Sequence, residues 1–200
     1  DRQPPLAVGR QGVREQDARD HGGQVADGVG LFHELTVSPL KEHARHNGHG
    51  QRDERLRAAA RLHDIGWVEG RKKHHKTSMR LIETDPALVP DETERSLVAL
   101  LARYHRRAWP SPRHRRFAAL GKDDRKCVRR LAALLRLADA LDYSRQGLVE
   151  DISARIGKKR VELCLQAKAP CPEEMRRAKV KGDLFEAEFG RELRCSCLPQ

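Results

Sequence analysis

The feature that most restricts the fold is a long segment of helical periodicity, DRKCVRRLAALLRLADALDYS, which covers residues 124–144. Four of its residues share one stripe of the predicted helix: Val128, Leu135, Asp139 and Asp142. An apolar stripe of this kind must pack against other elements of the fold. The segment therefore predicts a helix in the core of the protein, with two carboxylates on its inward stripe.

Further helical segments precede this one and are separated by turn signals. They are predicted at residues 18–35, at 52–66, from His74 onward, and at 91–109. Gly66 is expected to stop the second of these helices. Pro110 and Pro112 are expected to end the fourth. The fourth opens with Asp91 and Glu94, whose spacing is that of a capping box.

After Gly147 the hydrophobic period changes from about 3.6 residues to about 2. Residues 151–157 and 160–167 alternate around Gly-Lys-Lys, which predicts a β-hairpin. Residues 171–190 then predict a helix, and residues 191–198 predict a last strand. The expected fold class is therefore mainly α, with three parts: a flexible leader at 1–14, a helical domain at 15–147 and a small α+β (ββαβ) appendage at 148–200.

The chain of 200 residues is strongly basic, with a formal net charge of +11. This charge favours anionic partners such as polyphosphate, nucleotides or nucleic acid, and the alternative is a basic surface that only keeps the protein soluble. Aromatic residues make up 4%, too few to stack successive bases of a single strand. No helix-turn-helix or zinc-finger pattern occurs either. A phosphorylated polyanion is therefore favoured over nucleic acid as the partner.

The five cysteines form no paired framework, which favours reduced thiols in the cytoplasm. Cys195 and Cys197 are interpreted as alternate residues on one strand face rather than as part of a zinc site. No apolar segment approaches the ~18 residues that would span a membrane. Residues 1–17 lack the continuous hydrophobic block of a signal peptide. The sequence therefore predicts a cytoplasmic protein with no membrane partner.

Several helix faces that should be buried carry an ionisable residue. On the second helix, His63 continues the apolar stripe of three residues: Leu56, Ala59 and Ala60. An unpaired carboxylate in an apolar environment is unfavourable, so Asp139 and Asp142 must find a cation. Each residue has a simpler explanation, because Asp139 could pair with an arginine and His63 could be a satisfied core histidine. The repetition of the pattern on several helices favours a metal site.

Four motifs follow one another in a characteristic order. HDIGW at 63–67 and HHKTS at 74–78 precede LVALLARYHRRAWPSPRH and RLAALLRLADALDYSR. Together they resemble the C-terminal HD domain of the exopolyphosphatase/guanosine pentaphosphate phosphohydrolase (Ppx/GppA) family, within the HD superfamily of metal-dependent phosphohydrolases. HGGQVA corresponds to the first-helix histidine motif and KGDLFEAEFGREL to the end segment, so the resemblance covers about residues 18–194. It implies an HD-type helical bundle.

The resemblance implies metal ligands at four positions: His21, His63, Asp64 and Asp139. It puts His75 and His105 where related enzymes have histidines for a second metal or for substrate phosphate. Mixed imidazole and carboxylate ligands suit Mn, Mg, Fe or Co better than a structural zinc site with thiolates. The expected cofactor is therefore a divalent metal ion. Asp64 is also the expected base or orienter of an attacking water.

These residues imply metal-dependent hydrolysis of a phosphorylated, polyanionic substrate, either polyphosphate or a nucleotide. Positive side chains near the histidines could neutralise a phosphate chain. Alternatively, they only form a basic surface that is exposed to solvent. The set is Arg71, Lys72, Lys73, Lys76, Arg106 and Arg107. The alternative function is a non-catalytic module that binds polyphosphate or a nucleotide, or has a regulatory role.

The long enzymes of the family carry phosphatase chemistry in an N-terminal pair of actin-like domains with glycine-rich phosphate loops. No such loops occur in this sequence, so that mechanism is not expected of it. In the long enzymes the HD domain is regarded as a polymer-binding and dimerising part, which implies a homodimer. Hydrolysis of cyclic dinucleotides is disfavoured because the downstream Gly-Tyr-Pro motif is missing.

Overall fold

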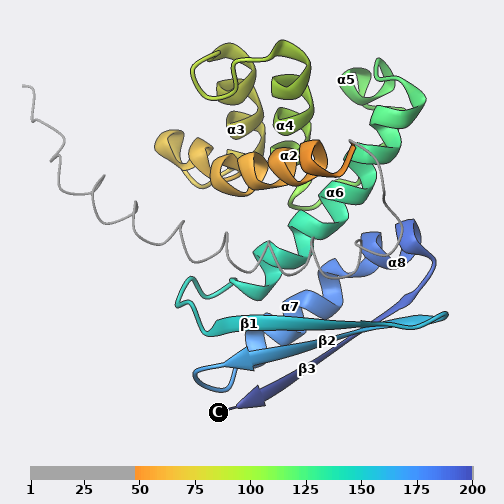
Figure 1. Cartoon of the computed structure of the whole chain (residues 1–200). Helices are drawn as coiled ribbons and strands as arrows, with labels where there is room; N and C mark the ends of the chain where they lie inside the picture. Colours follow the sequence, from red (N-terminus) through yellow and green to blue (C-terminus); the bar gives the residue numbers. More distant parts are fainter. Residues whose placement is uncertain (1–47, 200) are drawn as a thin grey trace, which may run out of the picture.

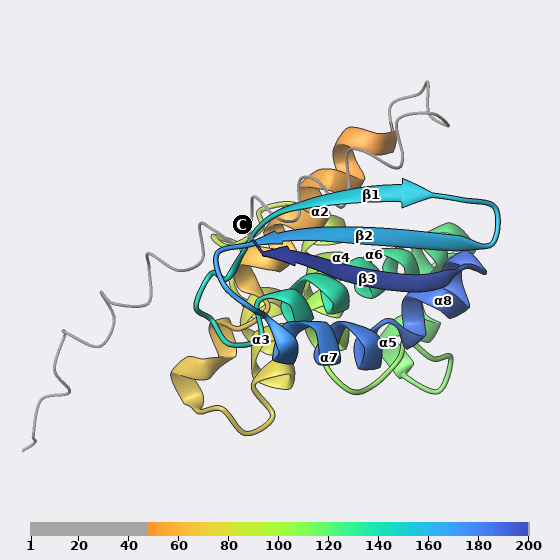
Figure 2. The same ribbon diagram turned by 90° about the horizontal axis from the view of Figure 1, so that it is seen from below.

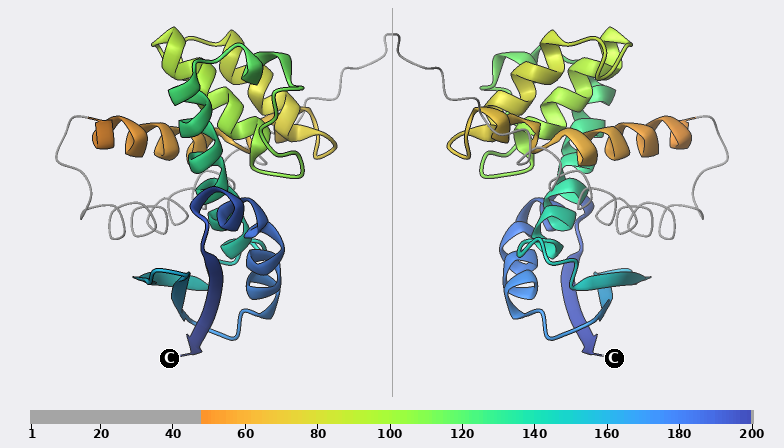
Figure 3. Two further views of the ribbon diagram at one scale, coloured as in Figure 1. Left: turned by 90° about the vertical axis from the view of Figure 1, so that its right-hand side faces the viewer. Right: turned by 90° about the vertical axis from the view of Figure 1, so that its left-hand side faces the viewer.

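The computed structural model describes residues 48–199. A body of helices lies beside a smaller α+β part, and the long helix α6 runs between the two (Figure 1 and Figure 3). The elements in chain order are α2 (Gly48–Leu62), the 3-10 helix η2 (Ile65–Glu69), α3 (His74–Thr84), α4 (Glu92–Tyr104), α5 (Arg115–Ala118), α6 (Lys122–Leu141), β1 (Val149–Ile156), β2 (Arg160–Ala167), α7 (Pro172–Lys181), α8 (Asp183–Phe189) and β3 (Glu192–Pro199). The prediction of a mainly α fold with a small C-terminal α+β part is confirmed.

Three predictions fall outside the described residues. They are the leader at 1–14, the helix at 18–35 and the ligand His21. In the part of the chain that is described, no helix combines the length and the hydropathy that crossing a membrane requires.

Helix α6 forms the centre of the fold, as its sequence predicts. Every residue from Leu131 to Leu141 is buried except Asp139. Apart from Arg136, the buried residues of this stretch are apolar, and a helix that is apolar nearly all round must be covered nearly all round. Helices α2 and α4 pack against α6 from the helical body, and α7 and α8 pack against it from the C-terminal part. Asp139 is therefore a carboxylate set into the most apolar stretch of the protein.

The prediction that Gly66 stops the second helix is wrong. Helix α2 ends at Leu62, and Gly66 lies buried within η2. A β-carbon at Gly66 would lie 2.3 Å from the backbone oxygen of His74 and 2.6 Å from the backbone nitrogen of Ser78. The Gly66 N–H donates to the Ser78 hydroxyl at 2.9 Å. This glycine is thus required for the close packing of η2 against α3, which is a tertiary role.

Helix α4 begins with the predicted cap. The Asp91 carboxylate accepts a hydrogen bond from the Glu94 backbone N–H at 2.8 Å. The reciprocal half of a capping box is missing, because the Glu94 side chain accepts instead from Arg55 Nη2 of α2 at 2.6 Å. The helix ends at Tyr104, before the position expected from Pro110. Asp91 thus caps the start of α4, while Glu94 joins α4 to α2.

Replacing Asp91 with alanine is expected to lower the free energy of unfolding by about 1 kcal/mol, because the cap of α4 is lost. Urea denaturation measures the change. The control is Asp123→Ala in the first turn of α6, where the N-cap makes no side-chain hydrogen bond. That variant should lose only a few tenths of a kcal/mol, roughly, from the helix dipole. Equal losses in the two variants would contradict the capping role.

The C-terminal part is a three-stranded sheet with strand order β1-β2-β3. Strands β1 and β2 pair antiparallel as the predicted hairpin, while β3 pairs parallel to β2. Helices α7 and α8 make the crossover between β2 and β3, and in Figure 2 they lie alongside β3. The predicted single helix at 171–190 is two helices that meet at Gly182. A β-carbon there would lie 2.8 Å from the Cδ2 atom at the end of the Leu193 side chain of β3, which would have to shift.

Candidate metal centre

Five side chains meet where the ends of three helices, α2, α3 and α4, converge on the last turn of α6. His63 and Asp64 follow α2, His74 begins α3, His105 follows α4, and Asp139 lies in the last turn of α6. Their ligand atoms form two groups, in each of which the atoms lie within 4.8 Å of one another. One group is His63, Asp64 and Asp139, and the other is Asp64, His74 and His105. Asp64 is common to both groups, so the arrangement could hold one or two metal ions.

The three histidines are oriented by backbone carbonyl groups three residues earlier in the chain. A carbonyl oxygen can only accept, so the Nδ1 atom of each ring carries the hydrogen. The Nδ1–oxygen distances are 2.7 Å from His63 to Ala60, 3.0 Å from His74 to Arg71 and 2.7 Å from His105 to Ala102. Each Nε2 atom therefore presents a lone pair to the centre of the cluster. Histidine ligands of metals are commonly held in this way.

The lone pairs at the centre lack hydrogen-bond donors. Among the described residues, His63 Nε2 and Asp64 Oδ1 are buried without a hydrogen-bond partner. His74 Nε2 lies 3.2 Å from His105 Nε2 and 3.0 Å from Asp64 Oδ1. Acceptor atoms this close repel one another unless a proton or a cation lies among them. The donor set therefore fits a divalent metal ion.

Charge and burial act in opposite directions on these groups. Burial favours the neutral form of His63, but Asp64 and Asp139 outweigh it and raise the pKa of the imidazole. Burial likewise opposes ionisation of Asp64, but the neighbouring His63, His105 and Arg145 lower its pKa to about 2. Burial lowers the pKa of His105 to about 3, which keeps that ring neutral and able to coordinate. The field that favours a proton on His63 also favours a metal cation beside it.

Two basic side chains contact the carboxylates from the outer side. Arg145 Nη2 hydrogen-bonds to Asp64 Oδ2 and lies 3.4 Å from Asp139 Oδ1. Lys181 Nζ, at the end of α7, hydrogen-bonds to Asp139 Oδ2. The pairing of Asp139 with an arginine, raised as the simpler explanation for this residue, is thus present beside the histidine cluster. Asp64 Oδ1 lies 3.0 Å from His74 Nε2, and Asp139 Oδ1, which Arg145 also contacts, lies 3.8 Å from His63 Nε2.

A family model described as Ppx/GppA phosphatase, domain III, matches residues 19–179. The chain belongs to the Ppx/GppA phosphatase domain III family. No curated protein matches the chain. The match contains all five residues of the cluster, whereas Lys181 follows its last residue. The expected relationship to the Ppx/GppA phosphatases is confirmed.

This Ppx/GppA domain has unusual backbone geometry at the rim of the cluster. Among the described residues other than glycine, only Lys73 and Arg145 have positive φ angles, of 62° and 59°. Lys73 immediately precedes His74, and Arg145 binds Asp64. Side chains in the left-handed region are unfavourable, and such residues concentrate at functional sites. The two strained positions fix the direction of one histidine and one guanidinium.

His74 is the residue that sequence patterns missed. It is buried and belongs to a ligand group, whereas its neighbour His75, which the resemblance indicated, belongs to neither group. The His75 ring lies 5.9 Å from that of His74 and 6.4 Å from that of His105. Burial and the nearby Arg103 lower the pKa of His75 to about 4. His75 therefore lies at the border of the cluster as a neutral imidazole.

The six predicted phosphate-binding cations lie on the surface near the cluster. Arg106 is half-buried and the other five are exposed: Arg71, Lys72, Lys73, Lys76 and Arg107. None of the six forms an ion pair with a carboxylate of the described residues, so their charge is available to an anion. The Arg71 guanidinium lies over the Trp67 ring, 4.8 Å from its centroid, and that of Arg145 lies 5.3 Å from the same ring. Trp67 therefore contacts both the exposed Arg71 and Arg145, which binds Asp64 of the cluster.

Proposed function

We propose that this domain is a metal-dependent phosphohydrolase that acts on a phosphorylated, polyanionic substrate such as polyphosphate or a nucleotide. The observation that carries the proposal is the convergence of three histidine Nε2 atoms on two partly buried carboxylates, with His63 Nε2 and Asp64 Oδ1 left without a hydrogen-bond partner among the described residues. His63, Asp64 and Asp139 would hold one ion, and His74 and His105 with Asp64 would hold another. His21, outside the described residues, stays the predicted fourth ligand.

The chain's own groups supply the remaining requirements of phosphate chemistry. A bound divalent cation supplies a Lewis acid for a phosphoryl oxygen and lowers the pKa of a bound water. Asp64, ionised because its pKa is about 2, can accept a hydrogen bond from such a water and orient it. The guanidinium of Arg145 and the ammonium of Lys181 can stabilise negative charge that develops on the phosphoryl group. The exposed cations, Arg71 and Lys76 among them, would hold the rest of a phosphate chain.

The charges of the cluster explain why the substrate would be anionic. Asp64 and Asp139 are balanced by Arg145 and Lys181, and an imidazole that coordinates a metal ion does so in its neutral form. A divalent cation would therefore leave a net positive centre within a domain that is basic overall. Such a centre attracts phosphate groups and repels cationic ligands.

The same two basic residues also favour a second candidate function, a non-catalytic binding module. Because Arg145 and Lys181 already neutralise both carboxylates, the cluster can fold without a metal. It would then hold a phosphate chain through basic side chains alone. The homodimer and the cytoplasmic location expected from the sequence remain predictions under either function.

Metal removal tests the proposal. The purified domain should bind Mn²⁺ tightly, and phosphate release from polyphosphate, pyrophosphate or nucleotides should stop after EDTA treatment and return when Mn²⁺ is added. Elemental analysis measures the metal and a colorimetric assay measures the phosphate. Substrate binding without phosphate release under any metal would instead support the binding module. Release that EDTA does not affect would contradict metal dependence.

A pair of neighbouring variants tests which histidine serves the centre. His74→Gln is expected to weaken binding of the divalent cation by at least about tenfold, since even the groups that orient metal ligands contribute this much. His75→Gln is the matched control and should change the affinity by less than about twofold. Calorimetric titration with Mn²⁺ measures both values. A larger effect at His75 would show that the second ligand group is assigned to the wrong residue.

A further inference from the structure

Two cysteine sulfurs lie next to each other in the C-terminal α+β part of the fold. Cys171 Sγ and Cys197 Sγ are 2.9 Å apart, although the two residues are 26 positions apart in the chain. Both are free thiols. A disulfide bond requires about 2.05 Å between the sulfurs, so a movement of less than about 1 Å would join them.

The other three cysteines have different surroundings. Cys127 Sγ accepts a hydrogen bond from an arginine of α2 at 3.5 Å, and Cys164 Sγ lies 3.2 Å from the Ser196 hydroxyl. Cys195 lies on β3 together with Cys197, and both pack against the hydrophobic core. Because side chains alternate along a strand, these two cysteines share one face of β3. Cys195 is therefore a matched comparison for Cys197.

The two neighbouring thiols belong to different elements of the α+β part. Cys171 is the N-cap residue of α7, and Cys197 lies in β3. Strand β3 is at the edge of the sheet, where it pairs with β2 and packs against α7 and α8. An edge strand has one neighbouring strand instead of two, so it opens more readily than the centre of a fold. A bond between the sulfurs would hold β3 to the start of α7.

Helix α7 also makes contacts that reach the surroundings of the metal centre. Glu174, in its first turn, is buried, and its carboxylate accepts a hydrogen bond from the Ser144 backbone N–H at 3.0 Å. Ser144 immediately precedes Arg145, which contacts the cluster. At the other end of α7, Lys181 hydrogen-bonds to Asp139. Helix α7 therefore supports both basic residues of the cluster, one directly and the other through the loop after α6.

Burial decides how fast this pair of thiols can react. Burial and the neighbouring Cys197 raise the pKa of the Cys171 thiol to about 12. The thiolate is the nucleophile in thiol–disulfide exchange, so a buried thiol of high pKa reacts slowly. Cys197 is half-buried and is reached first by an oxidant. A disulfide is uncharged, so burial does not oppose the product, and we expect a bond that forms slowly and persists.

We propose that Cys171 and Cys197 form a reversible disulfide bond, so that the redox state of the surroundings sets how firmly α7 is held to β3. The oxidant is a low-molecular-weight disulfide such as glutathione disulfide. The Cys197 thiolate attacks one sulfur of the oxidant and releases one glutathione, and the Cys171 sulfur then displaces the second. The two protein thiols give up two electrons and two protons, which leave as two glutathione thiols. The proposal does not depend on metal binding or hydrolysis.

Equilibration of the purified, reduced protein with glutathione and glutathione disulfide tests the bond. EDTA is included so that no metal ion bridges the thiols. The oxidised protein should lose two of its five thiols and the mass of two hydrogen atoms. It should also melt about 10 °C higher than the reduced protein, because the bond closes a loop around α7 and α8. A protein that keeps all its thiols, or keeps glutathione attached at Cys197, would overturn the proposal, as would a disulfide that leaves the melting temperature unchanged.

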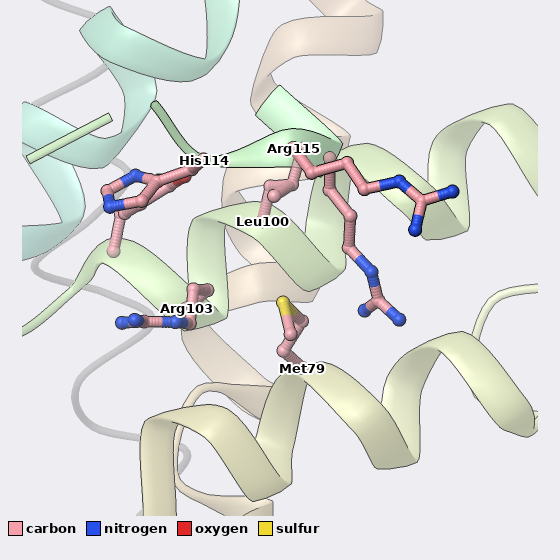
Figure 4. A pocket seen from close by; sticks show the side chains of 7 residues that line it. Met79, Leu100, Arg103, His114 and Arg115 are labelled. Carbon is pink, nitrogen blue, oxygen red and sulfur yellow. The ribbon is translucent and has the colours of Figure 1, made fainter. Parts of the chain in front are cut away.

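A disulfide is a better oxidant than peroxide for this experiment, because the sequence contains two methionines. Met79 lines a cavity of about 270 Å³ between α3, α4 and α5, and Figure 4 shows its sulfur facing this cavity. Peroxide converts a thioether of this kind to a sulfoxide, which changes the mass and the packing by itself. Exchange with glutathione disulfide leaves methionine unchanged, so the shift in melting temperature reports on the cysteines alone.

Variants of β3 identify the cysteine that forms the bond. Trypsin cleaves after Arg194 and leaves Cys195 and Cys197 on one peptide, so peptide mapping alone does not separate them. Cys197→Ser is expected to abolish the redox-dependent shift in melting temperature, whereas Cys195→Ser, the matched control, should keep the full shift. The opposite result would overturn the assignment. Cys197 is half-buried, so its variant keeps the test decisive even where Cys171→Ser, at a buried position, fails to fold.

Discussion

Asp64→Asn is expected to remove tight binding of the divalent cation and to lower phosphate release by about a thousandfold. Asp64 is the one residue shared by both ligand groups, so its loss affects every metal position that the cluster offers. Loss of groups that only orient metal ligands weakens affinity by roughly 10–100-fold, so a shared ligand should exceed that range. Asparagine keeps the size of the side chain, which separates the loss of charge from a loss of packing.

Asp123→Asn provides the control for this substitution. Asp123 is an exposed aspartate in the first turn of α6, and its replacement should leave metal content and rate unchanged. Elemental analysis and the phosphate assay measure both variants. If Asp64→Asn still bound metal and released phosphate at the original rate, the cluster would not be the catalytic centre. If the Asp64→Asn variant kept its affinity for tripolyphosphate, and neither this variant nor the unsubstituted protein released phosphate, the non-catalytic binding module would be supported.

Gly66→Ala is expected to lower the free energy of unfolding by about 3 kcal/mol, at the upper end for an overpacked interior. The added methyl group would meet backbone atoms of His74 and Ser78, which cannot turn away as a side chain can. Relief of the clash requires η2 and α3 to separate. Because His74 is the first residue of α3, the variant should also bind less divalent metal.

Gly50→Ala gives a matched comparison within α2. Nothing lies within 4 Å of a β-carbon at Gly50, and the residue is exposed. Alanine at this helical position should stabilise the protein by about 0.5–1 kcal/mol. Urea denaturation of the two variants should therefore give changes of opposite sign. A stable Gly66→Ala variant would mean that η2 and α3 are not packed as closely as described.

Much of the fold could be predicted because its elements follow their local patterns. Helix α6 was found from the spacing of Val128 and Leu135, and the hairpin from the change of period after Gly147. The role of Gly66 could not be found in this way. Its backbone conformation does not require glycine, and the requirement comes from α3, which approaches it in space.

The sequence indicated His75, whereas the structure brings His74 into the cluster, and this difference has a similar cause. Hydrophobicity aligned His75 with Met79 and Ile82, but the fully covered stripe of α3 consists of His74, Ser78 and Ile82. Ser78 is polar, so an apolar pattern passes over it, although its hydroxyl accepts a hydrogen bond from Gly66 and is completely buried. A buried serine that binds a backbone N–H leaves no mark in the periodicity.

Arg145 follows Asp139 by only six residues, but its contact with Asp64, and that of Lys181 with Asp139, could not be found from any local pattern. Arg145 and Asp64 are separated by 81 residues, and Lys181 and Asp139 by 42. The inward position of Asp139 on its helix did predict that a positive partner was needed. Which residues would provide it depends on how α7 packs beside α6, and that packing is a property of the whole fold.

The position of Lys181 matters for the order in which the molecule can be made. Synthesis proceeds from the N-terminus, so the carboxylate of Asp139 emerges well before the ammonium group that binds it. A polypeptide truncated after residue 147 would contain the histidines of the cluster and Arg145, but it would lack the ammonium group that binds Asp139 and the two helices, α7 and α8, that pack against α6. Premature termination should therefore yield a form that misfolds or is degraded, even though most of its helices are complete.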